Sequence, residues 1–469
     1  MKRITFFLAA LLMFSGLSVA QQRSAEEAAA LAAQFVNGRP ALRKAHRAPQ
    51  TADMMRLSHT RKKASQDENA FYVFNRADNA GFIVVSADER TAEDVLFYSE
   101  KGEFNMETVN PNLRWWLERF EKEISSIPAD EPVTNRAPQA VQEVTPIAPL
   151  LTDKNGKEIT WYQTEPYNNL CPIDRMDNTR SYTGCVATAA AQVMFHWRWP
   201  AKGSGISQYT WQNCLELNNY TGRCTNSKDT VLKANYSGTT YDWDNMTASY
   251  CNISYNWKGE MVCTVRAGIT QAQKDAVATL MYQCGVASEM EYGGDAYGGS
   301  GTLTDYMAYG LQKYFNYKFT KMITMYSQYE YGSAKGNIPI EYSVNRNKFT
   351  SYFNADLEAG RPIIMGGGSD SYGHEFVCCG RDKDNKFYIN WGWEGEGNGY
   401  TAISALRPEG DSSGFSQGLD AIIGLEPNIP EGVEEVPNNK VQSTKVLRNG
   451  QVLIQRGDAT YTIFGQKIN

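Results

Sequence analysis

A cysteine stands at the start of an apolar helical pattern in the stretch SYTGCVATAAAQVMF, residues 181–195. Apolar residues follow Cys185 at the three- and four-residue spacing of one helix face, and Pro200 ends the pattern. A helix N-terminus carries about half a positive charge and unpaired N–H groups, which stabilise a thiolate and lower the cysteine pKa. Gly184 lets other backbone approach the sulfur. A small buried hydrophobic residue is the commoner role of a cysteine, so the motif alone leaves a nucleophile and a core thiol open.

The histidines of the chain narrow the choice of a general base. There are four, at positions 46, 59, 196 and 374. The first two belong to an N-terminal unit that precedes a linker. His196 follows Cys185 on the same predicted helix, about 16 Å along its axis, which is too far to take a proton from the sulfur. His374 is therefore the predicted base for Cys185.

His374 lies in a predicted β-hairpin, GHEFVCCGRDKDNKFYIN, with the polar turn RDKDN. A turn centred on Asp382 pairs His374 with Asn390 and places their Cβ atoms about 5 Å apart on one face. The Asn390 amide would then accept the imidazole Nδ1 proton and leave Nε2 directed at the thiol. A turn centred on Asp384 would shift this register.

Two further side chains complete the predicted site. Trp391 follows Asn390 and either shields the hydrogen bond between asparagine and histidine from water or is a core residue. An oxyanion needs hydrogen-bond donors, and the Cys185 backbone N–H and the Gln163 side chain are the candidates. A glutamine alone is not diagnostic of that role.

The composition is that of ordinary globular domains. Of 469 residues, 42% are hydrophobic and 21% are charged, and the net charge is -6. This charge gives no indication of a nucleic-acid or anionic-membrane partner. None of the nine cysteines forms a CxxC pair, and no two histidines have the spacing of helix ligands, which argues against a zinc site. We expect no metal or organic cofactor.

The chain divides into four segments. Residues 1–20 combine a basic start, a short apolar run and a small-residue cleavage site, which is typical of an export signal and too short for a membrane span. Residues 21–143 form a small α+β unit that ends in a proline-rich linker. Residues 144–427 are helical first and β-rich later, which indicates the α+β class. Residues 428–469 are a second linker and a tail of short strands.

Local signals place most of the expected elements. The capping box Ser24–Glu27 predicts a helix that ends at Gly38, and Asn110 with Pro111 predicts the start of another. Further predicted elements are strands at 71–75, 81–86 and 95–98, a helix at 271–285, and tail strands that turn at 449–450 and 457–458. The RGD triplet at 456–458 is interpreted as part of a hairpin turn in preference to an adhesion motif.

Several ordered blocks of sequence resemble one known family. TGCVATAAAQVMFHWRWP, YGHEFVCCG and FYINWGWEG, with QTEPYN and EYGGDAYGGSG, are similar to blocks of the streptopain and interpain-type proteases, a secreted papain-like family. The resemblance runs from about residue 65 to residue 427. It implies a papain-like cysteine protease fold, with a helical left half and an antiparallel β right half, preceded by a small α+β pro-domain. It also implies roles for five residues: Cys185 as nucleophile, His374 as general base and acid, Gln163 as oxyanion donor, and Asn390 with Trp391 as supports of the histidine.

The same resemblance implies how the protein would be made and used. It implies a zymogen whose pro-domain covers the cleft or displaces His374, with maturation by cleavage in the proline-rich linker. The partners would be protein and peptide substrates and the protein's own pro-domain, with no nucleic acid and no membrane span. An apolar residue would be preferred two positions before the cut bond. The tail resembles short β-type sorting segments of exported proteins, which implies an extracellular or outer-surface location.

Some features depart from the family pattern. Glu375 follows the histidine where a small residue is expected. The cysteines outnumber the single thiol that the reaction needs, and Cys214–Cys224 and Cys251–Cys263 are the local disulfide candidates. Two other functions stay open on this sequence. One is a catalytically silent exported binding protein or adhesin on the same fold, and the other is an acyl or amide transferase that uses the same cysteine and histidine.

Overall fold

The computed structural model describes residues 22–429 with internal gaps, and short strands between 443 and 468. The gaps before residue 430 are 41, 44–48, 65–67, 129–143, 219–220, 222, 258–259, 326–334, 369–372 and 405–417. The predicted signal peptide at 1–20 and most of the proline-rich linker therefore lie outside the described residues. Residues up to Glu426 form one compact unit, and the rest of the chain forms a second.

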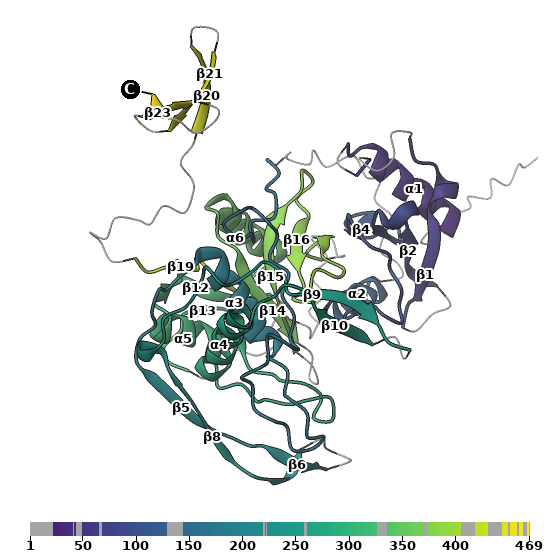
Figure 1. The fold of residues 1–469 in the computed structure, drawn as a ribbon. Helices are drawn as coiled ribbons and strands as arrows, with labels where there is room; N and C mark the ends of the chain where they lie inside the picture. Colours follow the sequence, from purple (N-terminus) through teal and green to yellow (C-terminus); the bar gives the residue numbers. More distant parts are fainter. Residues whose placement is uncertain are drawn as a thin grey trace, which may run out of the picture. The chain divides into compact units, whose positions relative to one another are not determined.

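Within the described residues, one sheet of eleven strands runs through the first unit (Figure 1). Its strand order is β1-β2-β3-β4-β17-β16-β15-β14-β18-β12-β13. The first four strands belong to the N-terminal segment, defined here as residues 22–128, and the others belong to the main region that follows. The two parts meet where β4 (Val95–Tyr98) pairs antiparallel with β17 (Gly399–Thr401). Backbone hydrogen bonds thus join the N-terminal segment and the main region in one sheet.

The N-terminal segment folds as its local signals predict. The Ser24 hydroxyl accepts the Glu27 N–H and the Glu27 carboxylate accepts the Ser24 N–H, while Asn110 caps the second helix with Pro111 in its first turn. The elements are α1 Ala25–Asn37, β1 Arg56–Lys62, β2 Asn69–Asn75, β3 Phe82–Ser86, β4 Val95–Tyr98 and α2 Pro111–Ser125. Strand β1 was not among the expected elements, because its residues are mostly exposed and polar and give no apolar alternation.

The main region is helical early and β-rich late, which confirms the α+β class. Its helices are α3 Cys185–Trp197, α4 Gln271–Ala287, α5 Thr304–Tyr314 and α6 Arg346–Glu358. Its strands in the large sheet are β12 Lys321–Met325, β13 Ile340–Glu341, β14 Ile363–Gly368, β15 Gly373–Arg381, β16 Phe387–Asn390, β17 Gly399–Thr401 and β18 Leu419–Ile423. The remaining short strands are β5 Ile206–Trp211, β6 Cys214–Leu217, β7 Cys224–Ser227, β8 Thr230–Asn235, β9 Cys251–Tyr255, β10 Met261–Val265, β11 Tyr317–Lys318 and β19 Glu426–Pro427.

Strand β15 separates two buried clusters. Alternate residues of a strand point to opposite faces of the sheet. Val377 and Cys379 belong to a cluster that includes the buried side of α3. Phe376 and Cys378 belong to a second cluster, which includes the buried sides of α2 and α6. The face that a β15 residue occupies therefore decides whether it lies toward α3 or toward α2.

Two disulfides close small β ribbons in the main region. Cys214 is bonded to Cys224 across β6 and β7, and Cys251 is bonded to Cys263 across β9 and β10. These are the two local pairs that the sequence suggests, so that prediction is confirmed. The free cysteines are at positions 171, 185, 284, 378 and 379.

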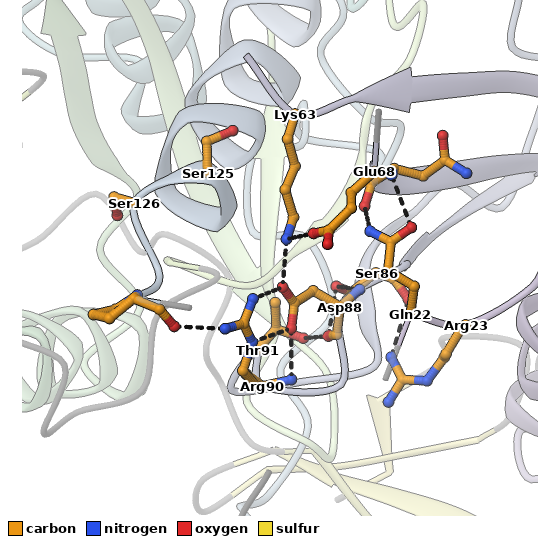
Figure 2. Close-up of polar contacts among 12 residues, drawn as sticks. Gln22, Arg23, Lys63, Glu68, Ser86, Asp88, Arg90, Thr91, Ser125 and Ser126 are labelled. Carbon is orange, nitrogen blue, oxygen red and sulfur yellow. Dashed lines mark hydrogen bonds and ion pairs between the residues drawn. The ribbon is translucent and has the colours of Figure 1, made fainter. Parts of the chain in front are cut away.

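A buried ionic cluster lies where the N-terminal segment ends (Figure 2). The Asp88 carboxylate accepts hydrogen bonds from Lys63 Nζ at 2.9 Å and from the Arg90 guanidinium at 2.6 and 2.9 Å. Burial raises the pKa of Asp88, but the bonds from Arg90 and Lys63 outweigh it and lower the pKa to about 2. Arg90 also donates to the backbone carbonyl of Pro128 at 2.5 Å. The cluster thereby holds Pro128, the last described residue before the gap at 129–143.

The second unit consists of four short antiparallel strands in the order β20-β21-β22-β23. They are β20 Ser443–Arg448, β21 Gln451–Arg456, β22 Ala459–Thr462 and β23 Lys467–Ile468. Arg456 lies opposite Ala459 in the pairing of β21 with β22. Gly457 and Asp458 themselves lie outside the described residues.

Candidate active site

Cys185 is the first residue of α3, at the position that the sequence predicts. Gly184 precedes it with φ 85°, and a Cβ at that position would meet the Met290 side chain at 2.7 Å. Only glycine adopts this left-handed conformation without strain and leaves this space free. Burial raises the pKa of the Cys185 thiol to about 11, and the Glu375 carboxylate adds to the rise, while backbone N–H groups oppose it. The thiol is therefore neutral in this state, in contrast to the lowered pKa expected from the helix terminus alone.

Gln163 lies beside the start of α3. Its backbone carbonyl accepts a hydrogen bond from the Thr183 N–H at 3.1 Å, two residues before Cys185. Its side chain is partly buried. The structure thus brings two of the five predicted site residues together at one helix terminus.

His374 lies on the face of β15 that is turned away from Cys185. It shares that face with Phe376, which is buried in the cluster with α2. The imidazole contacts the indole of Trp115 on α2, with 5.9 Å between ring centroids. Burial lowers the pKa of His374 to about 4, so the ring is neutral at neutral pH. The predicted contact between thiol and imidazole is therefore not formed in this state, and a helix of the N-terminal segment holds the histidine.

Glu375 takes the position that faces Cys185. The Thr304 hydroxyl lies 3.0 Å from both Glu375 Oε2 and Asp420 Oδ1. Burial, and then the neighbouring Asp420 charge, raise the pKa of Glu375 well above its ordinary value, and burial raises the pKa of Asp420 to about 6. Gly366 pairs with Glu375 across the sheet, and a Cβ there would meet Glu375 Oε2 at 2.2 Å. A buried carboxyl group with a raised pKa thus lies near the thiol.

The expected pairing of His374 with Asn390 is wrong for this state. Asn390 lies opposite Val377, three residues further along β15. Next to the turn, Arg381 pairs with Phe387 and Gly380 with Tyr388, which is the register of a turn centred on Asp384. An irregularity between Cys378 and Gly380 then shifts the pairing by one residue, so that Asn390 meets Val377.

Hydrogen bonds within the turn explain the register of the pairs next to it. Asp382 Oδ1 accepts hydrogen bonds from the backbone N–H groups of Asp384 at 3.0 Å and Lys386 at 2.8 Å. Asn385 adopts φ 61°, the left-handed conformation that asparagine tolerates well. An aspartate that caps the backbone two and four residues later moves the centre of the hairpin past Asp382.

Asn390 and Trp391 point toward different partners. The Asn390 amide donates to the Ile159 carbonyl at 2.7 Å and accepts the Gly392 N–H at 3.0 Å. The Trp391 ring packs against Trp116 of α2, with 5.8 Å between centroids. Asn390 is thus engaged on the side of α3, whereas Trp391 lies with His374 on the side of α2.

The arrangement offers the parts of a nucleophilic reaction, in two separated sets. The thiol, the Gln163 segment and Asn390 lie on one side of β15, while His374 and Trp391 lie on the other. Among the described residues, no group of three or more His, Cys, Asp or Glu side chains could hold a metal ion. No helix in the described part of the chain is long and apolar enough to cross a membrane.

Comparison with known families identifies the family to which the chain belongs. Residues 161–401 match the model of the peptidase C10 family, and this match spans a little over half of the chain. The chain belongs to the peptidase C10 family. Residues 20–124 match the Spi protease inhibitor model, which coincides with the N-terminal segment. This C10 peptidase thus carries an inhibitor-type unit ahead of its cysteine peptidase region, which is the organisation of a zymogen.

Individual relatives agree with this assignment. The C10 peptidase is 31% identical over 402 residues to the thiol protease/hemagglutinin PrtT of Porphyromonas gingivalis, covering 82% of this chain and 40% of that protein. It is 26% identical over 424 residues to streptopain of Streptococcus pyogenes, covering 86% of this chain and 92% of the relative. Its structure is similar to a fragment of prointerpain A from Prevotella intermedia, with a TM-score of 0.56 and 30% identity over 79% of this chain and all of that one. The α+β fold with a small N-terminal pro-domain is therefore confirmed.

Some residues of the site could not be found from the sequence. Glu375 was recognised as unusual, but its partners Thr304 and Asp420 lie more than forty positions away on either side. Trp115, which contacts His374, adjoins Trp116 on a helix whose apolar pattern gave only a core role. Nothing local in these stretches signals the pairing, because it is made by strands and helices that meet only in the folded chain.

Proposed function

We propose that this peptidase is the secreted precursor of an endopeptidase that cleaves proteins and peptides through Cys185 and His374. The observation that carries the proposal is the position of Cys185 at the N-terminus of α3, beside Gln163 and packed against the strand that carries His374. No other cysteine of the main region begins a helix in the described residues.

The proposed reaction uses these groups once His374 has reached the face of β15 that carries Cys185. The His374 imidazole takes the thiol proton, and the Cys185 sulfur forms a bond to the substrate carbonyl carbon. Negative charge moves to the carbonyl oxygen, where the Gln163 side chain and the Cys185 backbone N–H donate hydrogen bonds. The imidazolium then gives its proton to the leaving amine as the peptide bond breaks. Water attacks the resulting acyl-enzyme with the same imidazole as base and restores the free thiol.

The precursor needs a rearrangement before this reaction can start. We place the inhibitory segment at 21–143 and the catalytic region at 144–427, with cleavage in the proline-rich linker. Removal of the segment takes Trp115 away from His374. The first residues of β15 then turn over, so that His374 moves toward Cys185 and Glu375 leaves, with Asn390 and Trp391 as supports of the imidazole.

Export is the second part of the proposal. Residues 1–20 have the composition of a cleaved signal peptide, and residues 428–469 form a linker and a separate unit of short strands. We assign the tail to sorting of the exported protein, with an extracellular or outer-surface destination.

The test compares the full chain with Cys185→Ala and His374→Ala variants. We expect both to lose casein digestion and self-processing, as measured by mass spectrometry of the fragments. His196→Ala is the matched control, because His196 lies at the far end of α3, and it should keep activity within a few-fold. Casein digestion by purified Cys185→Ala protein would refute the assignment. Aminolysis products that dominate over hydrolysis in the presence of an added amine would instead indicate a transferase.

A further inference from the structure

Glu394 carries a buried carboxylate with an unusual number of donors. One oxygen accepts a hydrogen bond from the Tyr167 hydroxyl at 2.7 Å. The other accepts from the Ser249 hydroxyl and from the backbone N–H groups of Tyr250 and Cys251, both at 3.1 Å.

The Glu394 carboxylate is buried and lies near a positively charged side chain. The side chain of Glu394 is 2% exposed, and Arg266 lies 3.9 Å away at the rim. Burial raises its pKa, while the hydrogen bonds and then the Arg266 charge oppose that rise. The hydroxyl and backbone N–H donors hold this buried carboxylate firmly in place.

The backbone of Glu394 is strained. It has φ 50°, in the left-handed region, and it stands in the glycine-rich loop WGWEGEG, residues 391–397. Glycine would occupy this conformation without cost, whereas a residue with a Cβ costs on the order of 1 kcal/mol or more. A glutamate at this position indicates that its side chain makes interactions that offset the strain.

Glu394 and its neighbour Trp393 contact the Gln163 segment on both sides of the glutamine. The Glu394 N–H donates a hydrogen bond to the Trp161 carbonyl at 3.1 Å. The Glu394 carboxylate accepts a hydrogen bond from the Tyr167 hydroxyl. The Trp393 ring packs on Tyr162, with 5.2 Å between centroids. Residues 161, 162 and 167 are thus fixed from one loop, and Gln163 lies between them.

We propose that Glu394 is a positioning residue that holds the Gln163 segment so that the glutamine side chain donates to the oxyanion. The loop that begins at Trp391 then positions the oxyanion donor, Gln163, and also carries Trp391, the support of His374. The proposal rests on the proposed role of Gln163. Glu394 acts only through Gln163 and does not touch the reacting atoms.

The test is a double-mutant cycle on protein matured from the full chain. Glu394→Gln keeps the size of the side chain but places an amide N–H₂ against donors. We expect it to lower kcat about 10-fold with KM nearly unchanged, because a misplaced oxyanion donor weakens the transition state more than substrate binding. Gln163→Ala should lower kcat about 10²- to 10³-fold. Glu394→Gln added to Gln163→Ala should change kcat less than about 2-fold, because the residue through which it acts is gone.

Thiol alkylation gives a second and independent readout. Iodoacetamide modifies a thiolate without forming an oxyanion, so its rate at Cys185 should be the same in Glu394→Gln and wild-type enzyme. Tyr167→Phe removes one donor to the carboxylate and should give a smaller loss of kcat, which keeps the test valid if Glu394→Gln fails to fold.

Three results would overturn the proposal. If Glu394→Gln lowered kcat equally in wild-type enzyme and in the Gln163→Ala variant, Glu394 would act independently of Gln163. Slowed alkylation would show an effect on the thiol and imidazole. Unchanged kcat in both Glu394→Gln and Tyr167→Phe would show no role. Full activity of Gln163→Ala would refute the oxyanion role of Gln163 and is distinguishable from all three.

Discussion

The two faces of β15 hold neighbouring residues in contrasting surroundings. His374 faces α2 of the N-terminal segment, where Trp115 contacts it and burial lowers its pKa to about 4. Glu375 faces Cys185, where burial raises its pKa well above the ordinary value. Burial thus favours the uncharged form of both groups.

In the proposed mechanism, the precursor is silent because two adjacent side chains of β15 face the opposite way from their positions in the mature enzyme. His374 can reach Cys185 only when Glu375 leaves, so both burial environments are given up together. The two groups also make the latent state sensitive to pH in opposite directions, because acid charges the histidine and base charges the carboxyl pair.

The largest expected effect comes from His374→Ala, and it differs between precursor and mature enzyme. In the mature enzyme, turnover should fall about 10³- to 10⁴-fold, because the thiol loses its base. In the precursor, iodoacetamide labelling of Cys185 should be unchanged, since the imidazole lies on the other face. Slower labelling of the precursor variant would show that the two groups already interact there.

Trp115→Ala should weaken the face that holds His374. Removing a buried indole costs about 3–5 kcal/mol, measurable by urea unfolding of the Cys185→Ala precursor. In the active background, the variant should mature faster, and the pKa of His374 should rise toward its ordinary value. Trp115→Phe keeps a ring at the contact and is the matched control. Maturation of Trp115→Ala at the wild-type rate would mean that this contact does not maintain latency.

Acid should destabilise the latent precursor through His374. Its folded pKa of about 4 lies below the ordinary value of 6.5, so this stabilisation is present above about pH 6.5 and is lost as the pH falls through 4. The loss is about 3 kcal/mol. Unfolding of the Cys185→Ala precursor between pH 7 and pH 4 would measure it, with a His374→Gln companion expected to show a flatter profile. Parallel profiles would assign the acid sensitivity to other groups.

A rise in pH from 4 to 7 should act on the opposite face of β15, with the smallest effect. The folded pKa of Asp420, about 6, lies above its ordinary value of 3.8, so this stabilisation is present below pH 3.8 and is lost as the pH rises through 6. Glu375→Gln removes the neighbouring acid, so it should raise the precursor's stability at pH 7 relative to pH 4 by on the order of 1 kcal/mol. A lower stability of Glu375→Gln at pH 7 relative to pH 4 than in the parent would contradict the proposed coupling.

Much of the fold follows from short-range signals. The capping box at Ser24, the proline that starts α2 and the glycine before Cys185 each act within a few residues. Such contacts join residues that are close in sequence and do not depend on where distant segments lie. The same holds for Cys185 as a helix-terminal thiol and for the two disulfide pairs, which join cysteines 10 and 12 positions apart.

The register of the hairpin and the face given to His374 could not be determined in that way. Asp382 moves the turn by capping the backbone, and β4 of the N-terminal segment extends the sheet beside β17. Short-range signals in the sequence identify the candidate reactive residues and the helix that carries the thiol. Tertiary structure alone decided that His374 faces Trp115 and that Glu375 faces the sulfur. A strand has two faces with nearly equal local preferences, and only packing against α2 and α3 distinguishes them.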